Sequence, residues 1–108
     1  MRVSKIIALG LLASSCFSLV ASAAQIEVGQ KDKTFTPDAI TAAIGTTIRI
    51  TNDDSTVHNV MITNPDASIH NTGIQKQNET VNITLDKPGE YLVRCGIHPK
   101  MKLTVQSQ

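Results

Sequence analysis

From residue 25 onward, the chain consists of short segments in which apolar and polar residues alternate. A period of two is typical of a β-strand that packs one face against a core, because successive side chains point to opposite faces. Short strands separated by turn-forming residues predict an all-β sandwich or barrel. The clearest alternation occurs in residues 46–51, 57–62, 79–85, 90–95 and 101–106.

Weaker strand patterns occupy the rest of this part of the chain. Residues 25–28 begin extended, and Gly45 ends residues 38–44 after seven positions, which favours a strand over a helix. Pro37 excludes a central strand just before that segment, because proline lacks a backbone donor. Residues 63–78 show no clear periodicity and predict a long connection that allows one weak edge strand.

Several side chains that can bind metals fall in or beside the alternating segments. His58, Cys95 and Met101 are each in phase with the apolar residues of their own segment, so all three are predicted to face the core. His98 lies in the turn between Cys95 and Met101 and can approach the same place from outside. The apolar residues that set these phases are Val60, Ile62, Tyr91, Val93, Leu103 and Val105.

The turn at residues 95–101 reads Cys-Gly-Ile-His-Pro-Lys-Met and so combines a thiol, an imidazole and a thioether. Thiolate and thioether are soft ligands that favour Cu(I), and imidazole suits both copper oxidation states. Two histidines, one cysteine and a weakly bound methionine form an electron-transfer copper site, and His58 is the candidate for the second histidine. Each residue alone has an ordinary explanation, such as a buried cysteine or a core methionine. Their close spacing favours metal binding.

The first residues have the pattern of a secretory signal peptide. Two basic residues precede an apolar run over residues 6–20, which is too short to span a bilayer well, and small residues follow it as a cleavage site. The sequence does not choose between cleavage after Ala23 and cleavage after Ala24. With the second choice, residues 1–24 form the leader and residues 25–108 form a single domain. We therefore expect a periplasmic protein without stable membrane insertion.

Charge and cysteine content narrow the function of this domain. Without the leader's two basic residues, eight basic and nine acidic residues remain, which predicts neither nucleic-acid binding nor a polybasic membrane patch. Cys95 is the domain's single cysteine, so an internal disulfide is excluded and metal ligation would explain the thiol. The other cysteine, Cys16, leaves a lipoprotein alternative open, because small residues precede it.

The chain resembles the type 1 blue copper proteins, or cupredoxins, and among them small members such as amicyanin, plastocyanin and pseudoazurin. The resemblance rests on residues 58–60 (His-Asn-Val), residues 86–91 (Asp-Lys-Pro-Gly-Glu-Tyr) and the turn at residues 95–101. It implies a Greek-key β-sandwich of about seven to eight strands with one copper ion at one end. It also implies that Asn59 ties the two ligand-bearing segments together by hydrogen bonds. The implied copper ligands are His58, Cys95, His98 and Met101.

The function predicted from this site is a periplasmic carrier of single electrons between transient redox protein partners. A monomer without enzymatic activity is expected. The Cys95 thiolate and two imidazoles would form a nearly trigonal plane, with Met101 as a long axial ligand. His98 is expected to lie nearest to solvent and to be the electron port. The apolar rim around it would consist of Gly96, Ile97 and Pro99.

Other functions fit the same residues less well. A copper-binding module for storage or delivery, without electron transfer, is the main alternative, because Met61 and His70 lie near His58 in the sequence. A cysteine hydrolase is disfavoured, because no residue is identified that would orient the base or form an oxyanion hole. Zinc could bind the same four groups, but it prefers stronger ligands than a thioether.

Overall fold

The computed structural model describes residues 24–108. The predicted signal peptide, with Cys16, lies outside the described residues except for its last position, Ala24.

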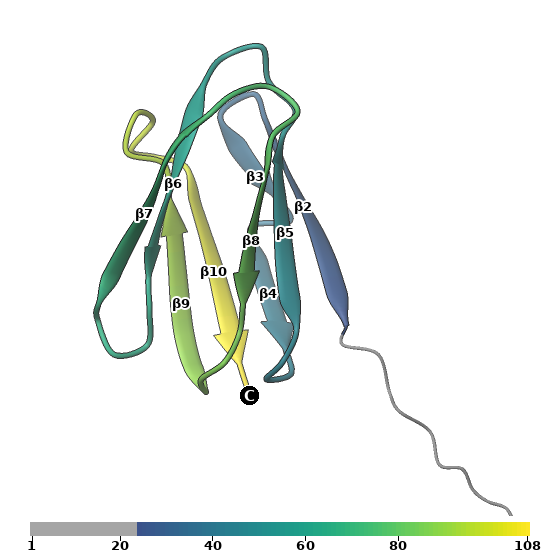
Figure 1. Ribbon diagram of the computed structural model, residues 1–108, viewed down its shortest axis with the longest axis vertical. Coiled ribbons are helices and arrows are strands. Elements are labelled where there is room, and N and C mark those ends of the chain that lie inside the picture. The colour runs from purple at the N-terminus through teal and green to yellow at the C-terminus, as the bar shows by residue number, and fades with distance from the viewer. Residues whose placement is uncertain (1–23) are drawn as a thin grey trace, which may run out of the picture.

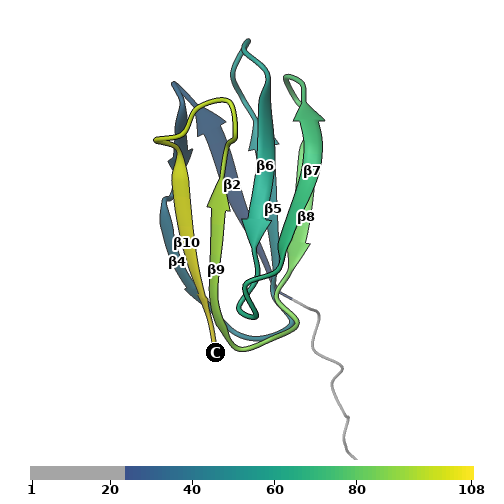
Figure 2. The same ribbon diagram turned by 90° about the vertical axis from the view of Figure 1, so that its left-hand side faces the viewer.

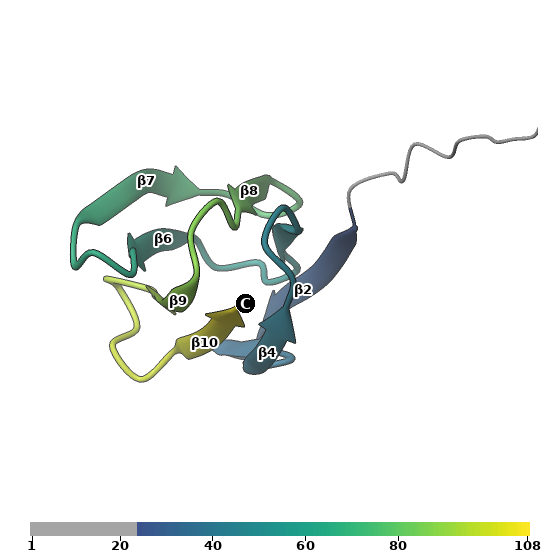
Figure 3. The same ribbon diagram turned by 90° about the horizontal axis from the view of Figure 1, so that it is seen from below.

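Two β-sheets packed face to face form the described domain (Figures 1, 2 and 3). The five strands of one sheet are, in spatial order, β4 (Ala39–Ala42), β10 (Lys102–Ser107), β9 (Gly89–Arg94), β6 (His58–Thr63) and β7 (Ile69–Gln75). The four strands of the other are β3 (Thr34–Thr36), β2 (Gln25–Lys31), β5 (Thr47–Asn52) and β8 (Thr80–Thr84).

The predicted all-β Greek-key sandwich is confirmed, and residues 24–108 contain nine strands, where about seven to eight were expected. The additional strand, β3, has three residues and was missed because so short a segment cannot display alternation. It lies at a sheet edge, where the neighbouring Pro37 is tolerated. The weak edge strand allowed in residues 63–78 is β7, at the edge of the five-stranded sheet.

The core between the sheets contains the inward residues that the alternation predicts. His58, Val60 and Ile62 are buried on β6, while Tyr91, Val93 and Cys95 are buried on and just after β9. Met101, Leu103 and Val105 are buried in the same way. Within residues 24–108, no helix has the length and apolar character needed to cross a bilayer.

Strand pairing brings three of the predicted ligands to one end of the sandwich. His58 is the first residue of β6, Cys95 follows the last residue of β9, and Met101 immediately precedes β10. β9 pairs in antiparallel fashion with both β6 and β10, so these three strand termini lie side by side at one end of the sheet. The loop between β9 and β10, which carries His98, closes the same end (Figure 1).

Replacing Ile48 with alanine should lower the free energy of unfolding by about 2–5 kcal/mol, because Ile48 is fully buried on the central strand β5. The matched control is Ile69→Ala on edge strand β7, where the side chain is 64% exposed. This change should alter the free energy of unfolding by less than about 0.5 kcal/mol. Urea denaturation of the metal-free protein measures the free energy of unfolding of both variants. Equal losses of stability in the two variants would contradict the assignment of Ile48 to the inward face of β5.

Candidate metal centre

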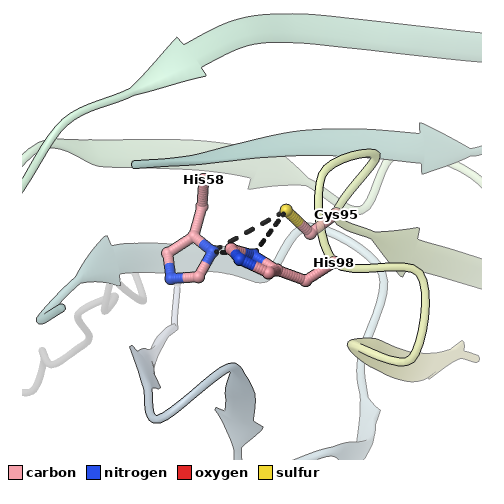
Figure 4. Close-up of side chains that lie close together, drawn as sticks. All are labelled: His58, Cys95 and His98. Atoms are coloured by element: carbon pink, nitrogen blue, oxygen red, sulfur yellow. Dashed lines mark hydrogen bonds between the residues drawn. The ribbon is translucent and has the colours of Figure 1, made fainter. Parts of the chain in front are cut away.

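Three potential ligand atoms face one another at the end of the sandwich (Figure 4). His58 Nδ1 lies 3.0 Å from His98 Nδ1, and Cys95 Sγ lies 3.7 Å from each of these nitrogens. His58 projects from the start of β6, while Cys95 and His98 project from the loop after β9. The two segments are therefore separated in the sequence and meet only in the fold.

The His58 imidazole is oriented by a carboxylate on its far side. His58 Nε2 lies 2.6 Å from Asp54 Oδ2, and the His58 side chain is fully buried. Because a carboxylate accepts hydrogen bonds, the proton on this ring belongs on Nε2, which leaves the Nδ1 lone pair directed at Cys95 and His98. Asp54 thereby selects the tautomer that can bind a metal through Nδ1.

Asp54 is itself held by the turn between β2 and β3. The backbone N–H groups of Asp32 and Lys33 donate to its two carboxylate oxygens at 2.8 and 3.4 Å. Burial alone would raise the pKa of Asp54, but the hydrogen bond with His58 and these two backbone donors together lower it below 3.8. The carboxylate is therefore ionised at neutral pH and able to accept the His58 proton.

The environment of His98 keeps its ring neutral. Burial, together with repulsion from His58 and Lys33, lowers the pKa of His98 below its ordinary value of 6.5. A neutral imidazole has a free lone pair, which metal ligation requires. His98 is partly exposed, whereas His58 and Cys95 are buried, so the expectation that His98 lies nearest to solvent is confirmed.

Asn59 connects the two ligand-bearing segments, as the family resemblance implied. Its backbone N–H donates to Cys95 Sγ at 3.4 Å, and its side-chain Oδ1 accepts from the Gly96 N–H at 2.5 Å. A Cβ atom on Gly96 would lie 3.1 Å from Met61 Sδ and 3.2 Å from Asn59 Oδ1. Glycine at this position therefore allows the loop to approach β6 closely.

Met101 ends the same loop and is buried, with 1% of its surface exposed. Its backbone N–H donates to the His98 carbonyl at 2.9 Å, so a tight turn carries both residues. Both side chains line one shallow hollow at the surface. His70 does not join the cluster; it is exposed on β7, opposite Ile62.

The geometry and chemistry of the cluster fit a metal ion. A point equidistant from the two nitrogens and the sulfur lies about 2.0 Å from each, close to metal–nitrogen bonds of about 2.0–2.1 Å and somewhat below a zinc–sulfur bond of about 2.3 Å. Two imidazole lone pairs directed at each other repel unless a proton or cation lies between them. The donors are one thiol and two imidazoles, with a thioether nearby, which suits copper.

Asp54 is the functional residue that the strand pattern did not identify. It lies in the turn before β6, and strand alternation says nothing about the direction of a side chain in a turn. Its spacing of four residues from His58 would indicate a contact in a helix, not in a turn followed by a strand. An acidic residue just before a candidate ligand histidine was the available signal.

Replacing Asp54 with asparagine should destabilise the metal-free protein at pH 7 by about 1 kcal/mol, because the amide accepts a weaker hydrogen bond than the carboxylate. The pKa of Asp54 is lowered on folding, so its contribution is present above 3.8 and is lost as the pH falls through the lower folded-state pKa. Urea denaturation between pH 7 and pH 3 should therefore show a difference that shrinks with acidification. The control is Asp53→Asn, which changes the exposed neighbouring residue. If the loss of stability in Asp54→Asn were the same at every pH, the ionised Asp54 carboxylate would not be its cause.

Comparison with known proteins supports the same family. A model of the cupredoxin-like domain matches residues 5–105 of the chain. No curated protein matches the sequence significantly.

Solved structures with the same fold include several copper proteins. The Cu(I) form of an amicyanin variant is 22% identical, with a TM-score of 0.72 over 82% of this chain and 86% of that chain. A purple cupredoxin from Nitrosopumilus maritimus is 19% identical, with a TM-score of 0.66 over 77% of this chain and 99% of that chain. A Cu-containing nitrite reductase from Thermus scotoductus is 25% identical, with a TM-score of 0.69, and the match covers 90% of this chain but 25% of that chain. Because the family model spans almost the whole sequence and the sandwich agrees with it, the chain belongs to the cupredoxin-like domain family.

Proposed function

We propose that this protein is a type 1 copper protein that carries single electrons between redox partner proteins in the periplasm. The observation that carries the proposal is the convergence of His58 Nδ1, His98 Nδ1 and Cys95 Sγ within 3.7 Å of one another. Family membership and the copper-containing structures that share the fold support it. The predicted signal peptide supports export.

Four residues would hold one copper ion per chain. His58 and His98 would supply imidazole nitrogens and Cys95 a thiolate, with Met101 as the weak thioether ligand. A copper ion bound there would exchange one electron by cycling between Cu(II) and Cu(I). The protein's task is then to hold these side chains in one arrangement that suits both states.

Hydrogen bonds restrict movement of the ligands. Asp54 fixes the His58 ring, and the backbone N–H of Asn59 donates to the Cys95 sulfur. A hydrogen bond to the sulfur withdraws charge from the thiolate and would thereby tune the reduction potential of a copper ion bound there. Ligands held in this way change position little when the charge changes, which favours fast electron exchange. His98, the partly exposed ligand, would be the route by which electrons enter and leave.

A transient carrier accounts for the chain better than an enzyme does. The described domain has the ligand cluster at one end and a shallow hollow beside it, which suits contact with a redox protein. We therefore propose a monomeric, non-enzymatic carrier.

Copper loading of the purified protein tests the proposal. The Cu(II) form should show strong visible absorption from a copper–thiolate bond and a matching EPR signal, and both should disappear reversibly on one-electron reduction. Cys95→Ser should abolish the visible absorption. A colourless protein that holds only Cu(I), with no reversible oxidation, would overturn the carrier and favour storage or delivery of copper.

A matched pair of histidine variants locates the site. His98→Ala removes a cluster imidazole and should change or abolish the visible spectrum, whereas His70→Ala removes an exposed imidazole outside the cluster and should leave it unchanged. Spectral loss in His70→Ala with retention in His98→Ala would contradict the proposed ligands.

A further inference from the structure

We propose that the hollow beside His98 is a docking site for a redox partner whose own docking surface is acidic. This inference rests on the proposed function and adds the chemistry of the partner. It depends on the charges around the hollow, which neither the ligand cluster nor the family determines.

The hollow combines an apolar floor with a cationic rim. It has a volume of about 470 Å³, and its lining residues are Lys33, Ile97, His98, Pro99, Lys100 and Met101. The charged side chains among them are both lysines. Ile97 is 44% exposed, and its neighbour in the hollow, Pro99, is exposed as well. An apolar patch next to a partly exposed ligand is a surface on which a partner can exclude water close to the metal site.

Two more basic residues extend this rim onto the outer face of the five-stranded sheet. Arg94 and Lys102 flank the loop at its two ends and are directly paired across β9 and β10. Both side chains are exposed. Like charges directly opposite each other destabilise a sheet, so this pair reduces the stability of the fold. Among the described residues, none of the four basic groups of this rim forms a salt bridge.

The basic rim contrasts with the rest of the domain. The predicted mature chain has eight basic and nine acidic residues. Two of the eight basic residues line the hollow, and two more flank the loop that forms most of its lining. Asp54 is nearby, but its carboxylate already accepts hydrogen bonds from His58 and from the turn backbone. Asp32, next to Lys33, is the exposed acid closest in sequence to the rim. Asp86 and Glu90 lie beside the start of β9, at the end of that strand remote from the loop.

Charge asymmetry of this kind acts mainly on the rate of encounter. Complementary charges raise association rates and orient the partner, and the effect falls as ionic strength rises. The apolar floor then allows close contact without a long-lived complex, which suits a carrier that must leave after each transfer. A partner with acidic groups around an apolar centre satisfies both parts of the surface.

Two redox-inert paramagnetic ions of opposite charge test the proposal without requiring electron transfer. Hexacyanochromate(III) is a trianion and hexaamminechromium(III) a trication, and each broadens the NMR signals of amides near its binding site. In the reduced copper-loaded protein, the anion should broaden the amide signals of Lys33 and of the four loop residues that carry an amide proton, which are Ile97, His98, Lys100 and Met101. The cation should not broaden these signals. The double variant Lys33→Glu, Lys100→Glu should weaken anion binding at least ten-fold.

The matched control is Lys87→Glu, which reverses the charge of an exposed lysine. Lys87 lies in the turn before β9, at the end of that strand opposite the ligand-bearing loop. It should leave anion binding at the hollow unchanged. Uniform broadening by the anion, or broadening centred on Lys87, would overturn the docking proposal even if the double variant failed to fold. A protein with a type 1 copper spectrum but no anion preference would refute this inference alone, whereas anion binding without reversible copper redox would refute the carrier function alone.

Discussion

The close approach of two imidazole nitrogens and a cysteine sulfur is the constraint on which this structure depends. His58 Nδ1, His98 Nδ1 and Cys95 Sγ lie 3.0–3.7 Å apart with their lone pairs directed inward. Without a proton or a cation between the nitrogens such an arrangement is unfavourable, so the fold has to impose it. The β6–β9 pairing sets the positions of the two segments, Asp54 fixes the ring of His58, and Asn59 ties β6 to the ligand loop.

This constraint also explains why the proposed ligands differ in exposure. His58 and Cys95 face the core at strand ends and are buried with the apolar residues of their own strands. His98 comes from the loop and remains partly exposed, so it connects the buried cluster to the surface hollow. The same loop places Lys100 beside that hollow, and its flanking residues, Arg94 and Lys102, extend the positive charge. Site and docking surface therefore share one loop.

Much of this arrangement follows from the sequence, because a strand has a strict period of two. The period identified the inward face of β6, β9 and β10, and with it the burial of His58, Cys95 and Met101. It could not identify β3, which is too short to show a period, or Asp54, whose direction depends on a turn. The sequence also did not predict that Lys33 lies beside His98. That position depends on how the β2–β3 turn of one sheet lies against the β9–β10 loop of the other sheet.

X-ray absorption at the copper edge of the loaded protein tests the central claim most directly. If the fold imposes the site, the Cu(II) spectrum should fit two nitrogen ligands at about 2.0 Å and one short sulfur ligand. The Cu(I) spectrum should then require the same ligands, with distances changed by no more than about 0.1 Å, a small fraction of these bond lengths. Four nitrogen or oxygen ligands without short sulfur, or loss of a ligand on reduction, would contradict a preformed His58–Cys95–His98 site.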